Sequence, residues 1–231
     1  MSTASSLSPA LQALARNMAR AFQHPINVPP DAELGAPLHQ AAAVKPSAPA
    51  LLAQCHAGPQ ARRNAVALYR RCLVAYRQRV QHAAGVDDAG LAAGVDDAGL
   101  AAGVDDAGLA AGVDDAGLAA AYFVLANLDA LHDLRPGRAE LAQVERQMRH
   151  GLGASWRLAP LPDRQSGFEQ LAVLGTLMTE SAFEARRRSA TAPAAVAHVQ
   201  QAARAYLVQF GLNPQRLRLS GSGLVLEAIA A

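Results

Sequence analysis

The chain has 231 residues, of which 51% are hydrophobic and 4% aromatic, and a formal net charge of +2. With half of its residues apolar, the chain can bury a core as one domain or two small ones, which argues against a disordered protein. No uncharged apolar run approaches the length of about 18 residues that a membrane-spanning helix needs, so the sequence excludes such a helix.

Alanine is abundant, which favours closely packed helices over sheets. All basic residues except Lys45 are arginine, a composition that suggests a GC-rich bacterial genome. Eight of the 19 acidic residues are aspartates of an internal repeat, so the rest of the chain has 21 basic and 11 acidic residues, a net charge of +10. A basic body of this kind suits either an anionic partner or ordinary solvated helix faces.

Residues 1–58 are predicted to form an N-terminal helix and a connector. Ser8, followed by proline, marks the start of the helix. Prolines then recur between residues 24 and 46, which blocks regular helix and predicts an extended connector. A short apolar segment, 48–56, closes this part of the chain. The predicted apolar stripe of the first helix consists of Leu11, Leu14, Met18 and Phe22.

A long amphipathic helix is predicted from Gln60 to Gln81. Cys72 lies on its apolar stripe, and its spacing from Cys55 is not that of a metal or redox motif. The two cysteines either form one disulfide or stay reduced. The apolar stripe consists of Val66, Tyr69, Cys72, Leu73, Tyr76 and Val80, and the opposite side carries Arg62, Arg63, Arg70, Arg77 and Arg79.

Four identical copies of Ala-Ala-Gly-Val-Asp-Asp-Ala-Gly-Leu occupy residues 83–118. Nine residues of helix turn through about 900°, so successive leucines would face opposite sides, and two glycines per copy cost about 2 kcal/mol relative to alanine. The insertion at 83–112 is therefore expected to stay outside the core as broken helix or loop, and its identical copies favour a recent duplication. Deleting three copies should leave the rest folded, which a melt followed by circular dichroism would test.

The nine-residue period is similar to that of calcium-binding β-roll repeats, in which glycines form tight turns and aspartates bind the ion. In this sequence Leu-Ala replaces the double glycine, and alanine replaces the inward aliphatic residue. Neither the turn nor the core of a β-roll is provided. The repeat therefore predicts no calcium site.

A helix ending near Leu134 is predicted to follow the fourth copy, with Asp114 or Asp115 capping its start. Asn127 falls in the middle of this helix beside the apolar stripe, where a polar side chain needs a partner. We expect Asn127 to form a structural hydrogen bond with a neighbouring helix or loop. The stripe itself consists of Leu118, Tyr122, Leu125 and Leu128.

Three more helices are predicted, and a short hairpin follows them. The first helix runs from 138 to 150 and ends at Gly151, which suits a C-cap. The others cover 163–188 and 193–210, and alternating residues at 217–219 and 224–226 predict the hairpin. The expected fold is all-α: an orthogonal or up-down bundle of about five to six helices within residues 59–231, with a Pro-rich N-terminal connector, the repeat insertion and the hairpin.

Three stretches, Leu68–Cys72, Asp115–Asn127 and Gly211–Leu219, resemble an uncharacterised, mostly proteobacterial family of unknown function. The resemblance covers about residues 62–219. It implies that an aspartate precedes a helix bearing Phe and Asn, that a helix starting near Gln and Glu follows, and that a turn lies near the C-terminus. It also implies an exported protein, periplasmic or secreted. The matching residues are Asp115, Phe123, Asn127, Gln165, Glu169 and the turn at 211–214.

No catalytic or metal-binding constellation is recognisable, and we predict no cofactor. A carboxylate-bridged metal centre in a bundle needs two Glu-x-x-His units, and Asp129 with His132 is the nearest match. Glu169, Glu180 and Glu184 are expected on a solvated face or as partners of arginine. Asn127 and Glu169 are the candidates for a structural polar cluster.

These observations predict a non-enzymatic helical interaction protein, with another protein as its partner. The alternative is arginine-mediated binding of nucleic acid or another polyanion, which the net charge of +10 outside the repeats motivates. Arg16 and Arg20 interrupt the apolar run that a signal peptide requires, which indicates a cytoplasmic protein if the resemblance is set aside.

Overall fold

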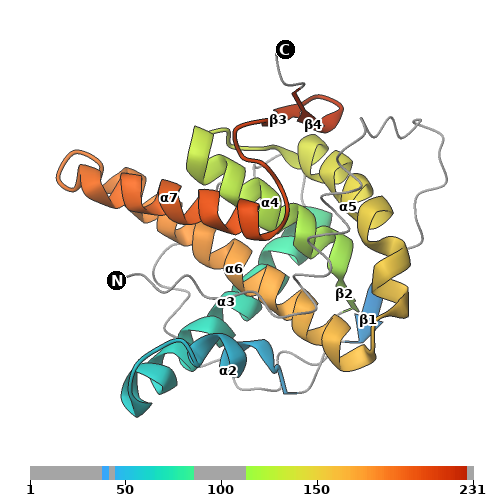
Figure 1. Ribbon diagram of the computed structural model, residues 1–231, viewed down its shortest axis with the longest axis horizontal. Helices are drawn as coiled ribbons and strands as arrows, with labels where there is room; N and C mark the ends of the chain where they lie inside the picture. The colour runs from blue at the N-terminus through green and yellow to red at the C-terminus, as the bar shows by residue number, and fades with distance from the viewer. Residues whose placement is uncertain (1–37, 42–44, 86–112, 228–231) are drawn as a thin grey trace.

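The computed structural model describes residues 38–41, 45–85 and 113–227. The predicted N-terminal helix, most of the connector and most of the first three repeat copies lie outside these residues, and the predicted division at residue 58 stays a prediction. The described elements are β1 (His39–Ala41), α2 (Ala48–Ala53), α3 (Pro59–Gly85), β2 (Val113–Asp115), α4 (Ala116–His132), α5 (Arg138–Leu158), α6 (Leu161–Arg187), α7 (Pro193–Gln209), β3 (Leu217–Ser220) and β4 (Gly223–Leu226) (Figure 1).

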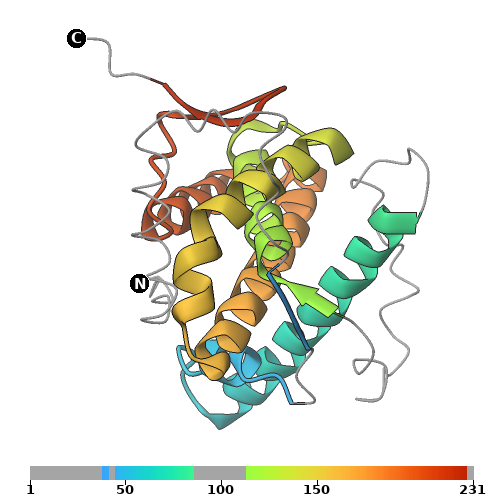
Figure 2. The same ribbon diagram turned by 90° about the vertical axis from the view of Figure 1, so that its right-hand side faces the viewer.

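Helix α4 is the centre of the fold. It packs against α5, α6 and α7, and of its residues only Leu118, Asp129 and His132 are not buried. A helix that is apolar around its whole circumference belongs inside a protein, because no face of it favours water. Helix α3 packs against α2 and α6 and lies along one side of the molecule (Figure 2).

The closest approach to α4 comes from α6. A side chain at Gly175 would place its Cβ 2.8 Å from Cδ1 of Tyr122 and 3.1 Å from the Cα of Phe123. Glycine at this position therefore lets the two backbones pack together. Helix α6 continues past α4 and forms with α7 a hairpin that projects along the long axis of the molecule (Figure 1).

Helix α5 does not end where the sequence predicted. Gly151 was expected to cap it, but the helix continues to Leu158. Leu152 and Trp156 extend the buried series on its inner face, and both are almost fully enclosed. Burial of these two side chains outweighs the cost of about 1 kcal/mol for a glycine inside a helix. The inner series consists of Leu141, Val144, Met148, Leu152 and Trp156.

Two small antiparallel sheets complete the described fold. The hairpin of β3 and β4 confirms the prediction from residues 217–226. The second sheet, which was not predicted, pairs β1 with β2 in the register His39 to Asp115 and Ala41 to Val113. Its strands are far apart in the sequence and only three residues long, so no local pattern predicts that they pair.

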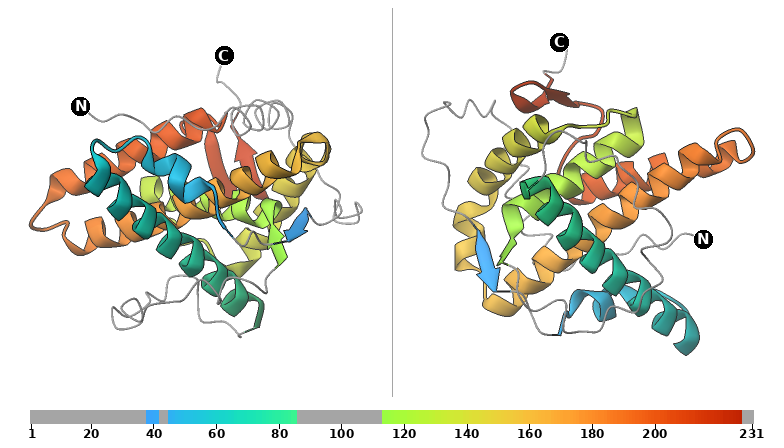
Figure 3. Two further views of the ribbon diagram at one scale, coloured as in Figure 1. Left: turned by 90° about the horizontal axis from the view of Figure 1, so that it is seen from below. Right: turned by 180° about the vertical axis from the view of Figure 1, so that it is seen from behind.

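Helix α3 runs across the face of the molecule that is seen from behind, together with the short α2 (Figure 3, right). The predicted apolar stripe is confirmed, with Tyr69, Leu73 and Tyr76 buried. The prediction that Arg77 and Arg79 lie on the outer side is wrong. The side chain of Arg77 is buried and bonds to Asp114 of β2. The side chain of Arg79 is 16% exposed, donates to Tyr122 of α4 and pairs with Glu180 of α6.

The two cysteines are not joined in a disulfide; Cys55 is exposed and Cys72 is buried. The sequence left open either a disulfide or two reduced cysteines, and the structure has the reduced cysteines. Burial raises the pKa of the Cys72 thiol to about 11. The thiol of Cys72 consequently behaves as a small apolar group of the core at neutral pH.

The mainly helical architecture with a short C-terminal hairpin confirms the predicted fold class. Among the described helices, none combines the length and the apolar character needed to cross a membrane.

Candidate functional site

Buried polar side chains gather at the start of α4, where β2 leads into the helix. This group, the Asp114 cluster, draws its residues from four elements. Four of its members are buried, and Arg149 and Gln165 are half-buried. Polar groups inside a protein are found where either structure or function requires them. Its members are Arg77 of α3, Asp114 and Asp115 of β2, Arg149 of α5, and Gln165 and Glu169 of α6.

Asp114 and Arg77 form a bidentate ion pair inside the protein. Nε of Arg77 lies 3.0 Å from Oδ1 of Asp114, and Nη2 lies 2.7 Å from Oδ2. The side chain of Arg77 is only 10% exposed and that of Asp114 only 3%. Burial raises the pKa of the Asp114 carboxyl, although hydrogen bonds from Arg77 and Gln165 act in the opposite direction.

Asp115 is the N-cap of α4, as one of the two predicted alternatives had it. Its Oδ1 accepts a hydrogen bond of 2.9 Å from the backbone N–H of Leu118, which has no partner within the helix. Its Oδ2 lies 3.0 Å from Nη2 of Arg149, and the same guanidinium pairs with Glu145. The stem of Arg149 crosses Gly117 so closely that a Cβ there would lie 2.4 Å from Cγ of Arg149.

Glu169 is fully buried, so the expectation that it lies on a solvated face or pairs with arginine is wrong. One carboxylate oxygen accepts a 2.9 Å hydrogen bond from the backbone N–H of Ala48, the first residue of α2. The other accepts one of 2.8 Å from Nε2 of Gln165. Glu169 therefore holds the start of α2 against α6, a contact between residues that are distant in the sequence.

Asn127 is also fully buried, but it bonds within its own helix. Its Nδ2 donates a 2.7 Å hydrogen bond to the carbonyl of Phe123, rather than to a neighbouring helix or loop as expected. Its Oδ1 has no hydrogen-bond partner within the described part of the chain. No hydrogen bond joins Asn127 to Glu169 among the described residues, so the two candidates do not form one cluster of directly bonded side chains.

Tyr76 is a buried polar residue that the sequence analysis treated only as part of an apolar stripe. Its ring packs edge-on against Tyr122 and Phe168. Burial, together with the nearby charges of Asp115 and Asp114, raises the pKa of its hydroxyl well above the usual value. The phenol is therefore neutral, and its hydroxyl makes no hydrogen bond to the described residues.

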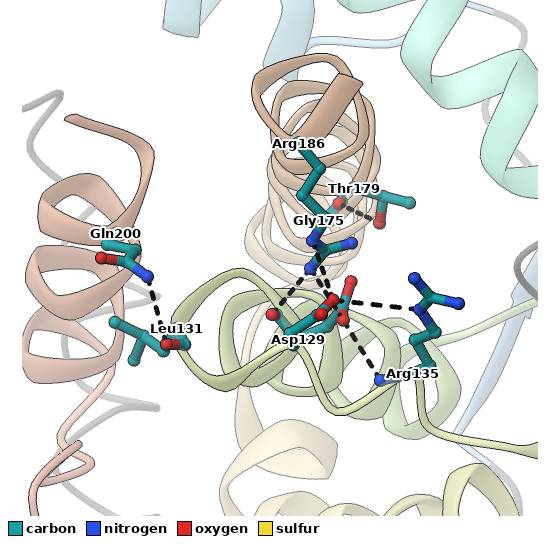
Figure 4. Close-up of polar contacts among 8 residues, drawn as sticks. Asp129, Leu131, Arg135, Gly175, Thr179, Arg186 and Gln200 are labelled. Atoms are coloured by element: carbon teal, nitrogen blue, oxygen red, sulfur yellow. Dashed lines mark hydrogen bonds and ion pairs between the residues drawn. The ribbon is translucent and has the colours of Figure 1, made fainter. Parts of the chain in front are cut away.

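The opposite end of α4 carries a second polar group, the Asp129 cluster of Asp129, Asp133, Arg135 and Arg186. Figure 4 labels Asp129, Arg135 and Arg186. Nη2 of Arg186 lies 2.8 Å from both the carbonyl oxygen and Oδ1 of Asp129, and its Nε lies 3.0 Å from Oδ1 of Asp133. Asp129 is thus engaged with arginine, while His132 is exposed. The pair that came nearest to a metal motif is therefore not assembled as one.

A model of the family of unknown function DUF6683 matches residues 45–227. The chain belongs to this family. No curated protein and no solved structure matches the chain. The matched range includes all the residues that carry the resemblance seen in the sequence, from Leu68 to Leu219. In the structure two of them, Gln165 and Glu169, are hydrogen-bonded neighbours, and Asp115 is the cap of α4.

In this DUF6683 chain the carboxylates of the Asp114 cluster are bound internally, to arginine, to amide groups or to the backbone. Within the described ranges, no group of three His, Cys, Asp or Glu side chains is placed to hold a metal ion. Glu180 and Glu184 bear out their prediction as partners of arginine, since Glu180 pairs with Arg79, and Glu184 with Arg187 and Arg188.

The outer face of α3 differs from these clusters, because its arginines have no acidic partner among the residues that the structure describes. Arg62, Arg63, Arg70 and Arg71 are all exposed, and none forms an ion pair with a residue that the structure describes. Within the described ranges, Arg62 donates to the carbonyl of His56, and Arg63 donates to the side chain of Gln60. Residues 35–86 contain no Asp or Glu at all, so this basic face has no acidic residue nearby in the sequence.

Proposed function

We propose that this protein is a non-enzymatic interaction protein that binds an anionic partner through the outer face of α3. The observation that carries the proposal is the contrast between the arginines of a single helix. Arg77 and Arg79 face inward and are neutralised by Asp114 and Glu180. The four outer arginines, 62, 63, 70 and 71, have no carboxylate partner among the described residues, which leaves their charge available to a ligand.

The inward polar groups support the non-enzymatic part of the proposal. A general acid or base must lie within reach of a substrate proton. The carboxylates of Asp114, Asp115 and Glu169 instead lie beneath the surface and hold β2, α4 and α2 in place. Their bonds account for their burial without a substrate.

Retention on immobilised heparin, a simple polyanion, tests the proposal. We expect the intact chain to bind at low salt and to elute early after Arg62, Arg63, Arg70 and Arg71 are changed to glutamine. The matched control is Arg187→Gln with Arg188→Gln, two exposed arginines that are paired with Glu184. We expect this control to elute with the unmodified chain, and a chain that flows through at low salt would refute the proposal.

A further inference from the structure

The proposed anionic partner is narrowed by the arrangement of α2 and α3. The two helices pack against each other and are joined by a turn at 54–58, where Gly58 has a positive φ of 83°. The first six residues of α3, from Pro59 to Asn64, are all exposed. In helix-turn-helix proteins, a short turn that often contains glycine leads into the helix that is presented to duplex DNA. Helices α2 and α3 share the glycine-containing turn and the exposed second helix, although their turn at 54–58 is longer than the usual three or four residues. Here α2, at six residues, is a short version of the first helix.

The outer arginines come in two pairs along this helix. Arg62 and Arg63 lie eight residues before Arg70 and Arg71, a separation of about 12 Å at 1.5 Å per residue. The major groove of B-form DNA is also about 12 Å wide, with a phosphate backbone on each side. Guanidinium groups bind phosphate oxygens through two donors at once, so each pair suits one backbone.

Between the two pairs, the exposed surface of α3 changes from charged to amide and apolar. Asn64, directly after the first pair, accepts at its Oδ1 a 2.9 Å hydrogen bond from Nε2 of Gln60, which lies before that pair. Ala67 and Leu68 follow on the exposed surface. Asparagine and glutamine read adenine edges in the major groove, and small apolar groups contact the thymine methyl. The surface between the arginines thus has the chemistry of base contacts.

We propose that the outer face of α3 is a binding site for B-form duplex DNA, with the two arginine pairs on the two backbones that border the major groove. This inference rests on the proposed function and narrows it to one ligand. Single strands are disfavoured because Tyr69 and Tyr76, the two tyrosines of α3, are buried and are not available for bases to stack on. Duplex RNA is disfavoured because its major groove is too narrow and deep for a helix.

Binding of a fluorescent random-sequence DNA duplex of about 20 base pairs, followed by anisotropy over a range of salt concentrations, tests the inference. Four phosphate contacts predict a slope of log K against log salt of about −3.6. Each arginine-to-glutamine change on α3 should reduce the slope by about 1, and the Arg187→Gln, Arg188→Gln control should not change it. A melt of each variant by circular dichroism separates loss of binding from loss of folding.

Two comparisons decide whether the ligand is B-form DNA. A duplex RNA of the same sequence should bind at least tenfold more weakly, and polyglutamate should not displace the DNA. Equal binding of RNA, or a preference for polyglutamate, would overturn the DNA inference while leaving intact the proposed function, the binding of an anionic partner by the basic face of α3. Failure to bind heparin, DNA and polyglutamate at low salt would refute both proposals. DNA binding that the four glutamines leave unchanged would refute the assignment to α3.

Discussion

The two ends of α4 use the same side chains, aspartate and arginine, in opposite surroundings. At the start of the helix the side chains of Asp114 and Arg77 are 3% and 10% exposed. At its end the side chains of Asp133 and Arg186 are 62% and 30% exposed. A solvent-exposed ion pair contributes little to the free energy of unfolding. A buried pair is costly to form because both charges lose water, and removing only one partner costs more because the other charge is then buried alone. The start of α4 is therefore a structural joint, and its end is a solvated cap.

The local sequence of α4 explains why its two ends are built differently. At the start, an aspartate cap fits the unpaired N–H groups, and burial beneath α3 and α5 requires that every charge have a partner. At the end, Asp133 adopts a left-handed conformation with φ of 53°, which stops the helix at the surface. Arg186 then binds the terminal carbonyl of Asp129, a favourable position for a cation.

Breaking the buried pair should have the largest effect. We expect Arg77→Met to lower the free energy of unfolding by about 3–5 kcal/mol, because it leaves the Asp114 carboxylate buried and unpaired. The double change Arg77→Met with Asp114→Leu should recover most of this loss, since no buried charge is left. Urea denaturation of the two single variants and the double variant measures the coupling. A double variant as unstable as the sum of the singles would contradict the assignment.

Gly117 tests the close contact at the same joint. We expect Gly117→Ala to destabilise the protein by about 1–3 kcal/mol, because the new methyl group would meet Cγ of Arg149 at 2.4 Å and disturb its bond with Asp115. Gly153→Ala on α5 is the matched control, since open space surrounds it, and should stabilise by up to about 1 kcal/mol. Thermal melts of both variants would show the opposite shifts, and a neutral Gly117→Ala would mean that Arg149 can move aside.

At the solvated end, the expected effect is smaller. Arg186→Gln removes contacts with Asp129 and Asp133 that are open to water, so we expect a loss of at most about 1 kcal/mol. High salt should reduce the difference between the two proteins, because it already screens the exposed pair. A loss as large as that of Arg77→Met, measured by the same urea titration, would erase the distinction between the two ends.

The pH dependence of stability should sharpen the comparison further. Burial raises the pKa of Asp114 in the folded protein, so the native state binds its proton more tightly than the unfolded state does. Its contribution to stability is therefore present below the ordinary carboxyl pKa and is lost as pH rises through the raised value. Asp114→Asn should remove this component, which urea titrations between about pH 3 and pH 7 would reveal. A difference of opposite sign would mean that Arg77 outweighs burial.

Periodicity predicted the helices well where an apolar stripe decided them, as in α3, α4 and α6. It failed at the end of α5, where Gly151 predicted a helix end. The helix continues because Leu152 and Trp156 are buried against the rest of the fold, which a local pattern does not reveal. Periodicity also missed the pairing of β1 with β2. Among the candidate site residues, Asp115 could be predicted because a helix cap is a local feature. The surroundings of Glu169 could not, because its partner is the backbone of Ala48.

By itself, the sequence determined the helical class, the start of α4 at an aspartate cap and the basic excess of the chain outside its repeats, because helix propensity, capping and charge act over a few residues. The tertiary structure alone decided which charges are buried. Arg77 and Arg70 lie seven residues apart on the same helix, yet one meets Asp114 inside the protein and the other is exposed. That difference depends on which elements pack against α3, and packing joins residues that the sequence keeps far apart.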